Sequence, residues 1–99
     1  MRTDPLGPVH PGEVLREEFM APLGLSAAAL ARAAGLRTAR IADIASERGA
    51  IRAPVAVRLA RVLDTTPEFW MNLQTRHDLD LAEHSSADAL KSLRPVAAE

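Results

Sequence analysis

Histidines and carboxylates are the residues of this chain whose types could support catalysis or metal binding. The histidines are His10, His77 and His84, and the chain contains no Cys. His77 and His84 are seven residues apart, about 10 Å along a helix that rises roughly 1.5 Å per residue, so they cannot bind one ion within a single chain. Without Cys there is no thiolate zinc site and no thiol nucleophile, and no hydrolase, phosphate-loop or metalloprotease motif is present. The sequence therefore predicts neither an enzyme nor a metal or cofactor site.

The other chemistry that the residues could support is the binding of phosphate by arginine. The 99-residue chain has a net charge of −1, but its charges are unevenly distributed. Residues 26–61 carry seven arginines against two carboxylates, a net charge of +5, whereas residues 1–25 carry −2 and residues 62–99 carry −4. A local cationic field of this kind can attract a nucleic-acid backbone even when the whole chain is acidic. A solvated arginine-rich surface would give the same pattern.

The composition indicates a small all-α protein. Hydrophobic residues make up 47% of the chain but aromatic residues only 3%, and Ala, Leu and Arg are strong helix formers. The length suits one domain over residues 1–99, with a core at about 10–82 and a tail over 83–99. No segment has the roughly 20 apolar residues that cross a bilayer, and no signal-peptide pattern is present, so we expect a cytoplasmic protein with no membrane partner.

Capping residues divide the chain into five helices. The first helix begins near Pro11, where His10 orders its start, and ends at Gly24. Ser26 and Gly35 bound a second helix over 27–34, in which Leu30 and Ala33 face inward. A third helix is predicted over 38–45, a fourth from about Pro54, and a fifth from Thr66 and Pro67, with another short helix after Glu83.

The second and third helices and the turn between them have the layout of a helix-turn-helix. Gly35 permits a tight left-handed turn, and Ile41 and Ile44 form the buried side of the third helix. On its outward side we expect Thr38, Ala39 and Asp43 to face bases, and Arg37, Arg40 and Arg48 to neutralise phosphates. A helical hairpin inside any small bundle is the alternative, but the cationic block favours DNA binding.

The fifth predicted helix carries an apolar stripe that is too long for one small core to cover. Its members are Phe69, Trp70, Leu73, His77 and Leu81, and we expect them to form the interface of a homodimer. Phe69 and Trp70 could instead stack on nucleobases, as aromatic residues do in proteins that bind single strands. Burial in a core or interface is the more common role of such a pair.

Several sequence strings make the chain resemble the HigA-type antitoxins, a branch of the Xre-like helix-turn-helix proteins. They are His10–Phe19 (HPGEVLREEF), Pro22–Ser26 (PLGLS), Leu30–Arg32 (LAR), Arg58–Arg61 (RLAR) and Thr66–Gln74 (TPEFWMNLQ). The resemblance runs from His10 to about Leu81. It implies a five-helix, lambda-repressor-like homodimer that binds double-stranded operator DNA, represses its own operon and neutralises a RelE-like mRNA-cleaving toxin.

The family's base-reading positions fall on Thr38, Ala39 and Asp43 of this chain. Its phosphate-facing positions fall on Ser26, Arg37, Arg40, Ser46 and Arg48, and Ala27 occupies a DNA-binding position where the family commonly has Gln. The chain also has Ser46-Glu47-Arg48 where the family commonly has Asn-Gly-Lys or Asn-Gly-Arg. Two alternative functions therefore stay open: a stand-alone Xre-like regulator, or a protein-binding module that has lost operator recognition.

An acidic group near the start of the first helix is the candidate contact for the toxin. It consists of Glu13, Glu17 and Glu18. An RNA-cleaving protein must attract anions and is expected to be basic, so an acidic inhibitor surface is complementary to it. The same glutamates could simply stabilise the positive end of the helix dipole.

Overall fold

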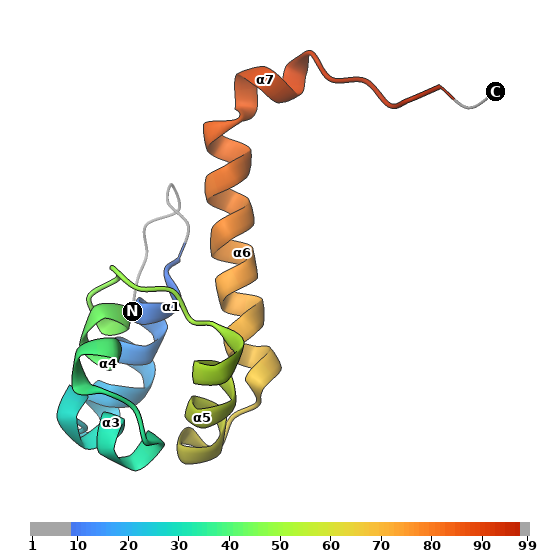
Figure 1. The fold of residues 1–99 in the computed structure, drawn as a ribbon. Coiled ribbons are helices and arrows are strands. Elements are labelled where there is room, and N and C mark those ends of the chain that lie inside the picture. The colour runs from blue at the N-terminus through green and yellow to red at the C-terminus, as the bar shows by residue number, and fades with distance from the viewer. Residues whose placement is uncertain (1–8, 98–99) are drawn as a thin grey trace.

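The structure, a computed structural model, describes residues 9–97, and every regular element in this range is a helix (Figure 1). In chain order the elements are α1 (Pro11–Val14), the π-helical stretch η1 (Leu15–Met20), α2 (Ala21–Leu23), α3 (Ala27–Ala34), α4 (Thr38–Ala45), α5 (Ala53–Leu63), α6 (Pro67–Ser85) and α7 (Ala87–Lys91). Because α1, η1 and α2 follow one another without a break, they form one first helix. Together with α3 to α6 it makes the five predicted helices, and the short α7 is a sixth, so the all-α class is confirmed over the described residues.

Local capping explains most of the helix boundaries. The Nδ1 atom of His10 accepts a hydrogen bond from the Gly12 N–H at 2.8 Å, as its predicted role at the start of the first helix requires. Ser26 and Thr66 accept bonds from the backbone N–H groups three residues further on, at 3.0 and 3.1 Å. Gly24 and Gly35 end their helices with φ values of 65° and 70°, a conformation that glycine adopts without steric cost.

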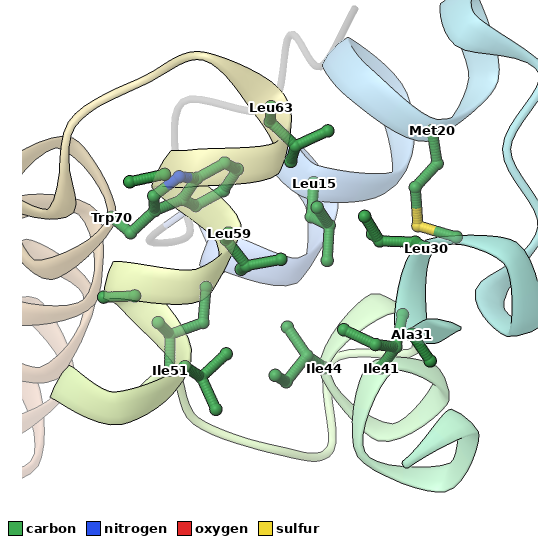
Figure 2. Close-up of a cluster of buried hydrophobic side chains, with 13 residues drawn as sticks. Leu15, Met20, Leu30, Ala31, Ile41, Ile44, Ile51, Leu59, Leu63 and Trp70 are labelled. Carbon is green, nitrogen blue, oxygen red and sulfur yellow. The ribbon is translucent and has the colours of Figure 1, made fainter. Parts of the chain in front are cut away.

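The core lies where the first helix, α3, α4, α5 and the first half of α6 meet (Figure 2). Its largest side chains, Trp70 and Leu15 among them, are fully buried. Ile41 and Ile44 anchor α4 to this core, and Leu59 does the same for α5. Burying a side chain of this size stabilises the fold by about 1.5–3 kcal/mol relative to exposure. The core therefore fixes which face of α4 points outward.

The three aromatic residues of the chain form one cluster that joins the first helix to α6. The ring of Phe19 lies 5.2 Å from that of Trp70 and 6.0 Å from that of Phe69, and the rings of Phe69 and Trp70 are 4.9 Å apart in an edge-to-face arrangement. The indole N–H of Trp70 donates to the Thr65 hydroxyl at 2.8 Å, so its polar atom is satisfied inside the fold.

The long helix α6 leaves the core at about its midpoint. Its last buried residue is Gln74, whose Oε1 accepts from the Ile51 N–H at 2.7 Å and whose Nε2 donates to Asp78 at 2.9 Å. Beyond this point α6 extends past the other helices, and α7 lies at its far end (Figure 1). The helix predicted after Glu83 is thus present as the last turn of α6 and as α7, whereas residues 92–97 have no regular structure. None of the described helices is both long and apolar enough to cross a membrane.

Three expectations about burial are corrected. Trp70, expected in a dimer interface, is fully buried in its own chain and has no surface left for a partner. Glu13, expected to contact a toxin, is only 8% exposed because α1 packs against α4 and α6. Ala33, expected to face inward, is exposed, and Ala34 is buried instead, because α3 also packs against α5.

Candidate nucleic-acid interface

Helices α3 and α4 pack together as the two helices of a helix-turn-helix. Gly35 makes the turn, and the half-buried Leu36 packs against the core directly after it. The guanidinium of Arg58 on α5 donates to the carbonyl oxygens of Ala34 at 2.9 Å and Gly35 at 3.4 Å. These carbonyls lie at the negative end of α3, where a cation is favoured. Arg58, which belongs to α5, thus stabilises the turn between α3 and α4.

Among the described residues, helix α4 presents an outward face whose side chains are exposed. Thr38, Ala39, Arg40 and Asp43 are all exposed, while Ile41 and Ile44 are completely buried. The exposed and buried positions alternate with the period of an α-helix, so one side of α4 is anchored and the other is free. Arg37, at the N-cap of α4, is exposed too. The residues expected to reach bases and phosphates on α4 and at its N-cap are therefore all accessible.

The turn after α4 holds the remaining candidates. The Ser46 hydroxyl donates a hydrogen bond to the backbone carbonyl of Asp43 at 3.1 Å. Arg48 forms an ion pair with the Asp43 carboxylate at 3.3 Å. The Arg48 side chain is still 73% exposed, so it remains accessible to a phosphate. Glu47 between them has φ = 68°, a left-handed conformation that costs a non-glycine residue roughly 1–2 kcal/mol.

Residues of the first helix contact the C-terminal end of α4. Arg16 donates to the carbonyl oxygen of Ala45, the last residue of α4, and pairs with the Glu47 carboxylate at 3.1 Å. Gly12 lies against the backbone of Ile44 so closely that any side chain at this position would collide with it. The orientation of the exposed face of α4 is therefore set by contacts with the first helix as well as by the core.

A histidine pair connects the start of the first helix to α6. The rings of His10 and His77 are 4.7 Å apart in an edge-to-face arrangement. Burial lowers the pKa of His10 below its ordinary value, and neighbouring His77 lowers it further. Because the Nδ1 atom of His10 accepts the Gly12 hydrogen bond, a neutral ring carries its proton on Nε2. The buried Nδ1 of His77 has no hydrogen-bond partner among the described residues.

The other predicted contact residues are spread over two further surfaces. On α6, Phe69 is 37% exposed and Leu81 48% exposed, whereas Leu73 and His77 are half-buried. Glu17 and Glu18 are exposed on the first helix, and Glu17 accepts from Arg16 at 3.1 Å. No group of three or more histidine and carboxylate side chains between residues 9 and 97 is placed to hold a metal ion.

Sequence reasoning missed Arg16, Arg58 and Gln74, which fix the geometry of this region. Their partners lie 23 to 31 residues away in the chain, so no local spacing pattern connects them. All three residues lie in the sequence strings that carry the family resemblance, but those strings do not show which distant groups they contact.

Comparison with known proteins places this geometry among DNA-binding regulators. Residues 15–70 match the helix-turn-helix family HTH_3. The antitoxin HigA-1 of Vibrio cholerae is 36% identical over 96 residues, which cover 97% of this chain and 90% of that relative. The solved structure of the Pseudomonas aeruginosa antitoxin HigA with the higBA promoter is 40% identical, with a TM-score of 0.86 over 91% of this chain and 99% of the other. The antitoxin GraA in complex with its operator is 48% identical, with a TM-score of 0.86 over 99% of this chain and 100% of the other.

The matched helices and the free outer face of α4 define the class as an Xre-like helix-turn-helix protein. Within that class the chain belongs to the family of HigA-type antitoxins. The family consists of antitoxins and transcription regulators and not of enzymes, as the sequence predicts.

Proposed function

We propose that this chain is the antitoxin of a toxin–antitoxin pair, which binds the operator of its own operon as a dimer and neutralises a RelE-like mRNA-cleaving toxin. The observation that carries the proposal is the uncovered outer face of α4, with Thr38, Arg40 and Asp43 exposed inside the cationic part of the chain. Relatives of 40% and 48% identity have been solved with promoter or operator DNA, which supports the same activity here.

The proposed contacts divide into two kinds. Thr38, Ala39 and Asp43 read base edges in the major groove, where sequence is encoded by donors, acceptors and methyl groups. The phosphate contacts, which fix register and supply affinity, are Ser26, Arg37, Arg40, Ser46 and Arg48, with Ala27 beside them. The ion pair between Arg48 and Asp43 links the two kinds of contact, because it partly neutralises the carboxylate that would otherwise repel the backbone.

The proposed dimer forms through the part of the α6 stripe that the core leaves accessible. Its residues are Phe69, Leu73, His77 and Leu81, of which Leu81 lies beyond the last buried position, Gln74. A two-fold axis through this seam gives two copies of α4, and each reads one half-site about 34 Å from the other.

For the toxin we propose Glu17 and Glu18 as contacts, since both are exposed on one acidic stretch of helix. A basic RNA-cleaving partner would be attracted to this charge. The test is co-purification of the small protein encoded beside this gene with wild-type chain and with Glu17→Lys/Glu18→Lys. An unchanged yield of toxin would remove the two glutamates from the proposal.

A gel shift on the DNA upstream of the chain's own operon tests operator binding. We expect a specific band whose affinity falls steeply with salt, because binding releases counterions from the backbone. The absence of any specific band at 50 mM salt would favour the second candidate, a protein-binding module that has lost operator recognition. Ala27 and Glu47 favour that second candidate, because they remove a polar group and add a carboxylate beside proposed phosphate contacts.

A further inference from the structure

The carboxylate of Glu47 lies on the turn that follows α4, between two proposed phosphate contacts, Ser46 and Arg48. A free negative charge at this place would repel a DNA backbone. The left-handed backbone of Glu47 adds a steric cost that a glycine would not have. Taken alone, this residue opposes the function proposed above.

Arg16 reaches this carboxylate from the first helix. Its guanidinium pairs through Nη2 with Glu47 Oε2 at 3.1 Å, donates through Nη1 to the carbonyl of Ala45, and contacts Glu17 through Nε at 3.1 Å. The Arg16 and Glu47 side chains are 39% and 35% exposed, so the ion pair is partly buried. One side chain thus holds both the last carbonyl of α4 and the charge on the turn after it.

We propose that Arg16 is a positioning residue for operator binding, which holds Glu47 against the first helix so that Ser46 and Arg48 can meet the DNA backbone. This inference rests on the proposed function. Arg16 needs no contact with DNA in this role, because it acts through the turn. Two effects combine: the arginine partly neutralises the carboxylate, and its bond to Ala45 fixes the end of the recognition helix α4.

A simple effect of total charge is the competing explanation, and a double-mutant cycle separates the two. If only the field of the charges matters, removing Arg16 weakens DNA binding by the same factor whether or not Glu47 carries a charge. If Arg16 acts by holding Glu47, the loss is large in the wild type and small once Glu47 is neutral. Residues in direct contact show such non-additivity, whereas distant residues do not.

The experiment measures operator affinity by fluorescence anisotropy, on the upstream DNA of the chain's own operon at one fixed salt concentration. The variants are Arg16→Gln, Glu47→Gln and the double variant, with Arg94→Gln as a control that removes the same charge from the C-terminal segment. We expect Arg16→Gln to bind about fivefold more weakly, from a charge interaction over several ångströms at intermediate dielectric. In the Glu47→Gln background the same change should cost less than about twofold, as should Arg94→Gln.

Arg16→Lys and thermal melts separate positioning from a loss of folding. Lysine keeps the charge, so Arg16→Lys should retain most of the affinity. Glu47→Gln should rescue the DNA binding of Arg16→Gln without restoring the thermal stability that the bond to Ala45 provides. Equal losses in both backgrounds, or no loss in Arg16→Gln, would overturn the role of Arg16 while operator binding stands. A wild-type chain that binds no operator would overturn both proposals.

Discussion

Gly12 of the first helix lies directly against the backbone carbonyl of Ile44 on α4. A Cβ atom added to Gly12 would stand 1.7 Å from the Ile44 oxygen and 2.8 Å from its carbonyl carbon. Both neighbours are backbone atoms of a helix anchored in the core, so they cannot move aside as a flexible side chain would. The first helix and α4 are thus in contact at a place where only glycine fits.

Replacing this glycine is therefore expected to move α4. Gly12→Ala should lower the free energy of unfolding by about 3 kcal/mol, the upper part of the usual range for overpacking. Chemical denaturation measures this loss. Gly24→Ala is the contrasting variant, because Gly24 has open space around it and loses stability only through its positive φ. A Gly12→Ala protein as stable as the wild type would contradict the close contact.

The contact between His10 and His77 predicts that the stability of the fold depends on pH. Burial and His77 lower the pKa of His10 in the folded chain below its ordinary 6.5, so the unfolded chain binds a proton more readily. The stability that the neutral ring provides is therefore complete above about pH 6.5 and decreases as the pH falls through 6.5 toward the lower folded value. The nearby Glu47 and Asp78 oppose this lowering, and Arg16 adds to it.

His10→Asn isolates that contribution, because asparagine also caps helices but does not titrate. Urea denaturation of wild type and variant at pH 7.5 and 5.5 measures the difference. The wild type should lose more stability than His10→Asn over this interval. Parallel losses in the two proteins would show that His10 is not the titrating group.

The proposed dimer seam predicts opposite results for two exposed leucines of α6. Leu81 and Leu79 are 48% and 52% exposed, but two residues along a helix point in opposite directions. Leu81→Asp should convert the dimer to a monomer at low micromolar concentration without unfolding the chain, whereas Leu79→Asp should leave the dimer intact. Sedimentation velocity and circular dichroism measure the two outcomes. A dimer that survives Leu81→Asp, or that is lost equally in both, would contradict the proposed seam.

Replacing Trp70 tests whether this residue belongs to the core of one chain or to the dimer interface. Because its ring is fully buried and its N–H bonds to Thr65, Trp70→Ala should cost about 3–5 kcal/mol of stability. The loss should be the same at low and high protein concentration, since the ring packs within one chain. A loss that disappears as the concentration rises would instead assign Trp70 to the interface.

The position of Arg58 predicts a role in fixing the turn of the helix-turn-helix. Arg58→Ala removes two hydrogen bonds from a cation to the carbonyls of Ala34 and Gly35, and should cost about 2 kcal/mol. Arg61→Ala, one turn further along α5 and also exposed, serves as the control and should cost less than about 0.5 kcal/mol. Thermal or urea denaturation compares the two. Equal losses would show that the contacts of Arg58 with the turn do not contribute to stability.

The sequence predicts the helices well because their signals are local. Ser26, Gly35 and the Thr66-Pro67 pair each act on backbone groups within four residues, and α3 and the start of α6 lie where these residues predict them. The outward face of α4 follows in turn from the spacing of Ile41 and Ile44.

The remaining features depend on contacts between distant segments, which spacing does not reveal. Arg16 meets Ala45 and Glu47 across 29 and 31 residues, so its role was invisible in the sequence. An apolar stripe also does not show which of two apolar surfaces covers it, and for this reason Trp70 was predicted at the interface instead of in the core. Glu13 was predicted on the surface because an acidic residue in the first turn of a helix is usually exposed, but it is buried.

The most direct test of the account measures the affinity of wild type, Thr38→Ala and Arg40→Glu for two duplexes by fluorescence anisotropy. One duplex is the upstream operator and the other a scrambled sequence of the same composition. We expect the wild type to prefer the operator, Thr38→Ala to lose about tenfold of that preference while binding the scrambled duplex normally, and Arg40→Glu to weaken both duplexes alike. Equal wild-type affinity for the two duplexes, or the same loss on both from Thr38→Ala, would contradict base reading by the exposed face of α4.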